Sequence, residues 1–344
     1  MNVTLKDIAK ALNVSHTAVS MALNGKAGVS DETRQRILKA AKEMNYMPNL
    51  AARSLISNKS GTLGLVISNI ADPFYPKLAR GVEVRANELG YNIILNNTDG
   101  NVQKEKHCIE TLLSRGVDGI ICSTVTVDDP NLDLLMERRF PFVALNRVPV
   151  DRPDADKIDY VVIDSYSGGY KAVNHLFRLG HDRIAVIAGA KKTSTTRDRT
   201  RGARQAMKDA GLQIDSKLIA YCNYERNRAF TAAKRLLAKD SAPTAFFTQD
   251  DNMALGVREA AFSLGLKIPE DIALVGFDDI DIAALTGIEL TTISQKEYDM
   301  GVMATSILID KIGNQSVHMV NKVTLEAKLL IRRSCGYRLS GYIR

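Results

Sequence analysis

The chain has 344 residues, of which 45% are hydrophobic and 25% are charged, a composition typical of globular proteins with substantial cores. It holds no run of about 20 apolar residues that could cross a membrane, and its first residues lack the apolar core of a signal peptide. The formal charge is +7; residues 1–60 hold nine Lys and Arg against four Asp and Glu, which leaves +2 for the rest and indicates a basic module for an anionic partner.

Residues 1–48 are predicted to form a helix-turn-helix unit. Thr4 is a good N-cap for a first helix, in which apolar side chains recur with helical spacing. Ser15 and Ser30 are placed to cap a second and a third helix. Pro48 ends the third, because the residue before a proline disfavours helical geometry. Two short helices closed by a third are typical of DNA-binding proteins.

The second of these helices carries candidate DNA contacts. In helix-turn-helix units it lies in the major groove, with its N-terminal turn toward the base edges. Its outward face offers His16, Thr17 and Ser20, three side chains suited to hydrogen bonding. A merely solvated face is the alternative, and the pattern favours base contact.

The first sixty residues resemble the head of the lactose-repressor (LacI/GalR) family of bacterial transcription regulators. The resemblance is carried by VTLKDIAKALNVSHTAVSMALNG and by VSDETRQRILKAAKEMNYMPNLAARSL. It implies a helical head, a hinge helix and a two-lobed α/β domain with parallel sheets, like that of periplasmic binding proteins. The DNA-binding residues that it implies are Thr4, Ser15, His16, Thr17, Ser20, Met21, Asn24, Tyr46, Asn49, Ala52 and Leu55. Met21 stands where the family commonly has arginine, which puts the usual base preference there in doubt.

Residues 49–61 are the expected hinge. By the resemblance, this segment becomes helical on the operator, where the two copies of a dimer meet in the minor groove. Leu55 would then wedge into the central base step, and Ala52 would pack against the partner hinge, with Asn49 at the helix start. Without the resemblance, the residues favour an ordinary linker helix docked on the large domain.

Residues 62–344 are predicted to form an effector-binding and dimerisation domain of two lobes. Short apolar runs alternate with helical stretches, such as 74–89 and 102–115, a pattern typical of parallel sheets with helices on both faces. Two such series follow one another. We expect a switch between lobes near residues 146–160, where the run YVVID opens the second series, and a return near residues 290–300.

Polar side chains follow many of the apolar runs, and ligands of parallel sheets bind beyond the carboxyl ends of the strands. Carboxylates, amides and arginines can bond adjacent hydroxyls, and an aromatic ring can stack on a sugar. Matching the family residue by residue gives the effector site Asp72, Phe74, Tyr75, Asn146, Arg147, Arg199, Tyr224, Asp250, Asp278 and Gln295. We therefore expect a small carbohydrate effector.

Other roles are open for single members of this set. Phe74 is also compatible with the core. Asp250 and Asp278 are compatible with helix capping, a role that we expect more of Asp251 or Asp279.

Signatures of catalysis and of metal binding are lacking in the sequence. GAKKTS does not complete a phosphate-binding loop, because isoleucine stands where that loop needs its first glycine, and no Gly-x-Ser-x-Gly elbow occurs. The five histidines are far apart and the paired acids have no His or Cys nearby, so we expect neither enzyme, metal nor cofactor. Four scattered cysteines are typical of reduced, buried thiols in a cytoplasmic protein.

The sequence thus predicts a homodimeric DNA-binding transcriptional regulator, most simply a repressor. It would bind a pseudo-palindromic operator and be controlled by a small carbohydrate between the lobes. Two alternatives stay open. One is control by a phosphorylated carrier protein; the other is a cytoplasmic sugar-binding module or sugar enzyme with an incidental basic head.

Overall fold

The computed structural model describes residues 3–47, 59–123, 126–148, 154–212, 215–314 and 319–337. The chain divides into two compact units, Met1–Ser60 and Gly61–Arg344. The predicted hinge contacts Asn49, Ala52 and Leu55 lie outside the described residues.

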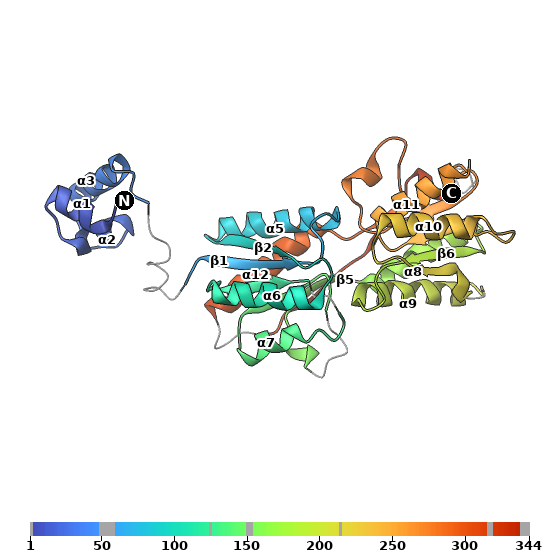
Figure 1. The fold of residues 1–344 in the computed structure, drawn as a ribbon, viewed down its shortest axis with the longest axis horizontal. Coiled ribbons are helices and arrows are strands. Elements are labelled where there is room, and N and C mark those ends of the chain that lie inside the picture. Colours follow the sequence, from blue (N-terminus) through green and yellow to red (C-terminus); the bar gives the residue numbers. More distant parts are fainter. Residues whose placement is uncertain are drawn as a thin grey trace. The chain divides into compact units, whose positions relative to one another are not determined.

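The first unit is a set of three helices around a small core: α1 (Leu5–Leu12), α2 (His16–Leu23) and α3 (Asp31–Glu43) (Figure 1). The Thr4 hydroxyl accepts a hydrogen bond from the Asp7 N–H at 3.4 Å, and the Asp7 carboxylate accepts one from the Thr4 N–H at 2.9 Å. This reciprocal cap starts α1. Ser15 and Ser30 cap α2 and α3, which confirms the predicted helix starts. One fully buried side chain from each helix fills the centre: Ile8, Val19 and Ile37.

The second unit is an α/β domain, as the sequence predicts. Its strands are β1 (Thr62–Ile67), β2 (Asn92–Asn97), β3 (Gly119–Cys122), β4 (Phe142–Leu145), β5 (Tyr160–Ile163), β6 (Ile184–Ala188), β7 (Ile219–Tyr221), β8 (Ala245–Thr248), β9 (Ala273–Val275), β10 (Thr292–Ser294), β11 (Lys322–Leu325) and β12 (Lys328–Leu330). Its α-helices are α5 (Phe74–Glu88), α6 (Val102–Ser114), α7 (Asn131–Glu137), α8 (Ser165–Arg178), α9 (Ser194–Asp209), α10 (Arg226–Leu237), α11 (Asp251–Ser263) and α12 (Glu297–Gly313). Short 3₁₀ turns are η1 (Ala155–Lys157), η2 (Ser216–Leu218), η3 (Asp281–Ala284) and η4 (Arg333–Cys335).

Two parallel sheets form the two lobes. The first has the strand order β11-β5-β4-β3-β1-β2 and the second β7-β6-β8-β9. A short antiparallel pair, β10-β12, accompanies them. All neighbours within each large sheet run parallel, so the carboxyl ends of their strands share one edge per lobe.

Helices cover both faces of each sheet (Figure 1). In the first lobe α5 and α12 share a core with Leu65, whereas α6 and α7 share one with the next residue, Val66. In the second lobe α8 and α9 pack with Phe247, and α10 and α11 pack with Phe246. Adjacent strand residues therefore serve opposite cores, as the pleat of a strand requires.

Glycines allow two helix pairs to approach closely. A Cβ on Gly81 of α5 would lie 2.2 Å from the Tyr298 carbonyl oxygen of α12. A Cβ on Gly202 of α9 would lie 2.0 Å from the Tyr166 carbonyl oxygen of α8. The first contact holds α12, which comes late in the sequence, against the first lobe.

The chain changes lobe slightly later than predicted. β5 pairs with β4 on one side and with β11 on the other, so the run YVVID completes the first sheet and does not open the second. The crossing follows Ile163, a few residues beyond the expected range 146–160. A return falls between β10 and α12. A third crossing, between β11 and β12, was not predicted: β11 pairs with β5 in the first lobe, and β12 pairs with β10.

All four cysteines are free and buried, as expected. Over the residues that the structure describes, no helix is both long and apolar enough to span a membrane. In the same ranges, His, Cys, Asp and Glu side chains form no group of three that could hold a metal ion.

Candidate functional site

The predicted base-contacting residues lie on the N-terminal half of α2. His16 and Thr17 are exposed in its first turn, and Ser20 is half-buried one turn later. The Ser15 hydroxyl accepts a hydrogen bond from the Ala18 N–H at 3.1 Å, so it caps α2. The helix therefore presents exposed polar side chains at the turn that enters the major groove in helix-turn-helix proteins.

The other predicted DNA contacts of the head also support its fold. The Asn24 side-chain amide donates to the Ser20 carbonyl oxygen at 2.8 Å, which closes the end of α2. Met21 packs against the turn that follows α2, and Tyr46 packs on the small core. Thr4 caps α1. These four residues thus help to fix the position of α2 within the three-helix unit.

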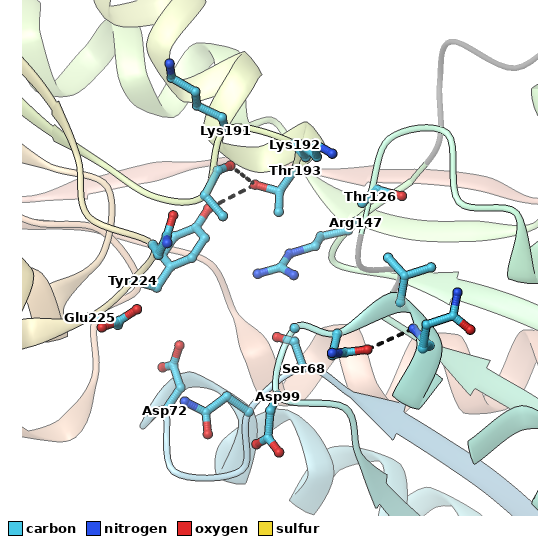
Figure 2. Close-up of a pocket in the computed structure, with 17 residues that line it drawn as sticks. Ser68, Asp72, Asp99, Thr126, Arg147, Lys191, Lys192, Thr193, Tyr224 and Glu225 are labelled. Atoms are coloured by element: carbon cyan, nitrogen blue, oxygen red, sulfur yellow. Dashed lines mark hydrogen bonds between the residues drawn. The ribbon is translucent and has the colours of Figure 1, made fainter. Parts of the chain in front are cut away.

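A cavity of about 700 Å³ lies in the second unit, between the lobes (Figure 2). The first lobe lines it with the loops after β1, β2, β3 and β4, and the second with the loops after β6 and β7. The cavity therefore lies at the carboxyl ends of both sheets, where open α/β folds bind ligands.

Three predicted effector residues line this cavity: Asp72, Arg147 and Tyr224. The side chain of Arg147 points into the cavity, with its guanidinium carbon 5.5 Å from the centroid of the Tyr224 ring. Arg147 is only 8% exposed, and its Nε has no hydrogen-bond partner among the described residues. Burying such a group without partners is costly, which indicates that a ligand completes its bonding.

The Tyr224 ring is fixed by its hydroxyl group. The hydroxyl lies within hydrogen-bond reach of three threonine hydroxyls, at 2.8 Å from Thr196, 3.0 Å from Thr195 and 3.5 Å from Thr193. Gly189 lies against the ring, where a Cβ would come within 2.1 Å of Tyr224 Cζ. The orientation of the ring toward the cavity is therefore set before any ligand binds.

Four more predicted residues form a buried cluster beside the cavity: Arg199, Asp250, Asp278 and Gln295. Arg199 Nη1 lies 3.8 Å from Asp278 Oδ1, and the guanidinium carbon lies 3.6 Å from the centroid of the Phe277 ring. The Gln295 amide donates to the Asp278 carboxylate. Buried atoms in this region without a partner among the described residues are Arg199 Nε, Asp250 Oδ2, Gln295 Oε1 and Asn146 Oδ1. Unmet bonding capacity of this kind suits a ligand rich in hydroxyls.

Three carboxyl groups come together where the cluster meets the cavity. Burial raises the pKa of Asp72, Asp250 and Asp278, and the charge of Asp72 raises that of Asp250 further. The nearby Arg199 charge lowers the pKa of Asp278 in opposition to burial. Carboxyl groups that take up a proton can donate as well as accept, so this region offers both functions to a hydroxyl.

Backbone conformations are unusual at three of the predicted residues. Asn146, Tyr224 and Asp278 have φ angles of 64°, 62° and 118°, which residues other than glycine rarely adopt. Each follows the end of a strand. Such conformations persist where the surrounding structure imposes them, and they are frequent in ligand sites.

Phe74 and Tyr75 lie in the core of the first lobe and do not line the cavity. Their rings meet edge to face at 5.1 Å, and the Tyr75 hydroxyl lies 2.5 Å from the Ser68 hydroxyl and 3.3 Å from that of Ser123. The core interpretation is therefore correct for Phe74 and extends to Tyr75. The reason is that α5 starts at Phe74 and turns both rings toward the sheet.

The aspartate pairs divide their roles differently from the expectation. Asp250 caps α11, because its Oδ1 accepts from the Met253 N–H at 2.6 Å; its Oδ2 has no partner among the residues that the structure describes. Asp251 lies inside the first turn and bonds to other segments, and Asp279 pairs with Arg332 at 2.7 Å. The prediction that Asp251 or Asp279 caps a helix is wrong.

Comparison with known proteins decides the family. Residues 60–333 match the model for periplasmic binding proteins and the sugar-binding domain of the LacI family, and residues 4–49 match the model for bacterial regulatory proteins of that family. The chain belongs to the LacI family. It is therefore a DNA-binding transcriptional regulator with an effector domain.

Relatives of this LacI-family chain match it over most of its length. The ribose operon repressor of Escherichia coli (strain K12) is 37% identical over 309 residues, 90% of this chain and 93% of that one. A regulator CelR–cellobiose complex has a TM-score of 0.73 at 30% identity and covers 97% of this chain and 100% of its own. The lac repressor dimer bound to operator and the anti-inducer ONPF has a TM-score of 0.87 at 27% identity, with 97% and 99% covered.

Several polar residues of the cavity escape prediction from the sequence: Asp99, Asn101, Gln103, Lys191, Lys192 and Glu225. They follow β2, β6 and β7, so the rule that points to Asp72 after β1 also points to them. The family resemblance selects positions that relatives share, and it does not select these.

Hydrogen bonds join the lobes of this LacI-family domain at the rim of the cavity. The Val127 N–H donates to the Lys192 carbonyl oxygen at 3.0 Å, and the Val148 N–H donates to the Ser194 hydroxyl at 3.3 Å. The position of one lobe against the other therefore sets the shape of the cavity. A ligand that contacts both lobes will favour one arrangement.

A buried acid pair, Glu105 and Asp129, lies close to the cavity in the first lobe. Glu105 is 1% exposed, and its Oε2 accepts a hydrogen bond from the Asn131 amide at 2.8 Å. Burial, helped by a hydrogen bond with Asp129, raises the pKa of Glu105 to about 9. Asp129 in turn accepts from the N–H of Thr126, which lines the cavity.

Glu105→Gln is expected to flatten the pH dependence of stability. Because the pKa of Glu105 is raised from 4.5 to about 9, the folded protein keeps a proton that the unfolded chain releases above pH 4.5. The contribution of Glu105 to the free energy of unfolding is therefore full below pH 4.5 and is lost as pH rises toward 9. Glutamine imitates the protonated form. In urea unfolding, the free energy of unfolding of the variant relative to that of the wild type should therefore rise by at least about 1 kcal/mol between pH 5 and pH 8. Glu110→Gln, exposed on the same helix, is the control; parallel profiles for wild type and Glu105→Gln would contradict the assignment.

Proposed function

We propose that this chain is a homodimeric regulator of the LacI family whose affinity for a pseudo-palindromic operator changes when a small carbohydrate binds between its lobes. The observation that carries the proposal is a set of buried polar atoms in the cavity and the cluster beside it that have no partner among the described residues, on Asn146, Arg147, Arg199, Asp250 and Gln295. Hydroxyl groups can both donate to and accept from these atoms.

The shape of the site supports a sugar over other hydroxyl-rich molecules. Tyr224 presents a ring whose hydroxyl is already bonded, so it can stack on the apolar face of a sugar. Two of the relatives carry sugars in their names, ribose and cellobiose. The proposal includes no chemical step, because binding energy alone shifts the balance between lobe arrangements.

The head supports the DNA side of the proposal. His16 and Thr17 are exposed at the N-terminal turn of α2, and we assign base contacts to them. A dimer would place two such helices on two half-sites, which requires an operator with two-fold symmetry. The lac repressor, a structural relative, is a dimer on its operator. Such a regulator acts in the cytoplasm, where the DNA is.

Gel-shift titration of the full-length protein tests both sides together. An operator selected from random DNA should be palindromic, and at least one sugar of a panel (ribose, glucose, galactose and cellobiose, each with its phosphorylated form) should change its affinity about fivefold or more. If no member changes the affinity more than about twofold, the effector proposal is wrong.

Variants of the head separate DNA contact from effector binding. His16→Ala with Thr17→Ala should remove the preference for the selected operator and leave sugar binding in place, since both side chains are exposed outside the small core. Gln35→Ala, exposed on α3, is the matched control. Unchanged operator preference in the double variant would exclude these base contacts.

A further inference from the structure

We infer that the effector is an anionic sugar, and that its phosphate or carboxylate group binds at the start of α9 beside Arg147, Lys191 and Lys192. This inference rests on the proposed function and narrows its ligand class. Four observations carry it: unused space, a buried cation that forms no ion pair among the described residues, the placement of positive charge around the cavity, and the start of a helix there.

The first observation is the space outside the buried cluster. Asp250, Asp278 and Gln295 hold unpartnered or shifted polar groups that suit a sugar ring, yet none of them lines the cavity of about 700 Å³. Asp72 belongs to both regions, since it lines the cavity and interacts electrostatically with Asp250. A sugar ring that contacts Asp72 on the side of the cluster leaves room for a second group in the rest of the cavity.

The second observation is Arg147. Its guanidinium is charged at any pH that proteins tolerate, it is 8% exposed, and among the described residues it forms no ion pair. The carboxyl groups that act on it, Asp72 and Glu105, are both shifted toward the neutral form, because burial raises the pKa of each. A buried cation needs a counter-charge, and an anionic ligand supplies one.

The third observation is the distribution of charge around the cavity (Figure 2). Lys191 and Lys192 lie with the Thr193 hydroxyl at the second-lobe edge of the cavity, Asp72 and Asp99 lie at the first-lobe edge, and the Arg147 guanidinium lies between them. Both lysines are exposed; the Lys191 ammonium lies 4.8 Å from the centroid of the Tyr221 ring, a weak contact that an anion can replace.

The same side of the cavity is the start of a long helix. Thr193 is the N-cap of α9, which has 16 residues, and it lines the cavity. The N-terminus of a helix favours negative charge, and the two lysines directly precede it in the chain. Arg147 enters the same cavity from the first lobe, so an anion that contacts both Arg147 and the start of α9 would be held by both lobes.

Calorimetry on the full-length protein with matched ligands tests the inference. Ribose is compared with ribose 5-phosphate, and glucose with glucose 6-phosphate and glucuronate, so that phosphate and carboxylate sources are distinguished. Cellobiose serves as a neutral ligand of extended size, and inorganic phosphate is titrated alone. We expect at least one anionic sugar to bind about tenfold or more tightly than its neutral parent, with an affinity that falls as salt rises.

A double variant, Lys191→Gln with Lys192→Gln, adds a second measurement. It should weaken binding of the anionic sugar at least about fivefold more than binding of the neutral parent. Lys208→Gln, exposed near the other end of α9, is the matched control and should change neither.

The outcomes separate this inference from the proposed function. If a neutral sugar or cellobiose binds as tightly as every anionic form, the inference is wrong and the carbohydrate proposal stands. If inorganic phosphate alone binds as tightly as the sugar phosphates, the ligand class is wrong. Absence of binding by all sugars would overturn the proposed function, and this inference with it.

Discussion

Gly189→Ala is expected to weaken effector binding about tenfold or more while the protein still folds and binds its operator. The added Cβ would lie 2.1 Å from Cζ of Tyr224 and 2.5 Å from both Cε atoms, so the ring must move. Moving it breaks the contacts of its hydroxyl with Thr195 and Thr196, at 3.0 and 2.8 Å. The aromatic surface and the nearby Arg147 guanidinium then no longer hold the geometry that a bound sugar meets. A loss of about 1.4 kcal/mol of binding free energy from these contacts is enough for a tenfold lower affinity.

The measurement is calorimetric titration of the variant with the tightest-binding sugar of the panel, next to a gel shift without sugar. Gly313→Ala is the control, since a Cβ there meets nothing within 4 Å. A further comparison uses Tyr224→Ala with Gly189→Ala: the double variant should bind no worse than Tyr224→Ala alone, because the clash disappears with the ring. Wild-type affinity in Gly189→Ala would show that Tyr224 does not position the effector.

The fold follows from local patterns to a large extent. The helices predicted over 74–89 and 102–115 are found at Phe74–Glu88 and Val102–Ser114, and the capping roles of Thr4, Ser15 and Ser30 are confirmed. These features depend on residues within one or two turns of each other, which a sequence displays directly. The strand-end rule likewise locates Asp72, Arg147 and Tyr224, which the structure brings to one cavity.

Features that depend on distant partners are less accessible. β5 lies inside the first sheet because it pairs with β4 and with β11, which comes some 160 residues later, and no local signal at residues 160–163 shows the second pairing. Phe74 and Tyr75 follow a strand end as ligand residues do, yet the start of α5 turns them into the core. The position of a side chain relative to a sheet depends on the packing of the whole lobe.

Asp251 is the clearest case of a role that only the folded structure shows. It is fully buried, and its carboxylate accepts three hydrogen bonds: from the N–H groups of Asp279 and Ile280 at 2.8 and 3.1 Å, and from the Thr292 hydroxyl at 2.6 Å. It thus ties α11 to the loop after β9 and to β10. Asp278, the predicted effector residue with a φ of 118°, begins the loop that two of these bonds hold.

Asp251→Ala is expected to lower the free energy of unfolding by about 3–5 kcal/mol, because three donors, two of them buried, lose their acceptor at once. It should also weaken sugar binding, since the loop that carries Asp278 loses its anchor. Urea unfolding followed by circular dichroism measures the first effect, and calorimetry measures the second.

Asp251→Asn distinguishes the hydrogen bonds from the charge. Its amide oxygen can take the place of Oδ2 and accept from both backbone N–H groups, while its NH₂ group donates to the Thr292 hydroxyl, which accepts as readily as it donates. Burial raises the pKa of Asp251 from 3.8 to about 7, so at pH 6 the folded wild-type group is mostly neutral whereas the unfolded one has released its proton. Asp251→Asn should therefore match the wild-type free energy of unfolding below about pH 4 and exceed it as pH rises toward 7. If Asp251→Asn at pH 6 is as unstable as Asp251→Ala, then the negative charge, and not the three bonds, is what this position supplies to the lobe.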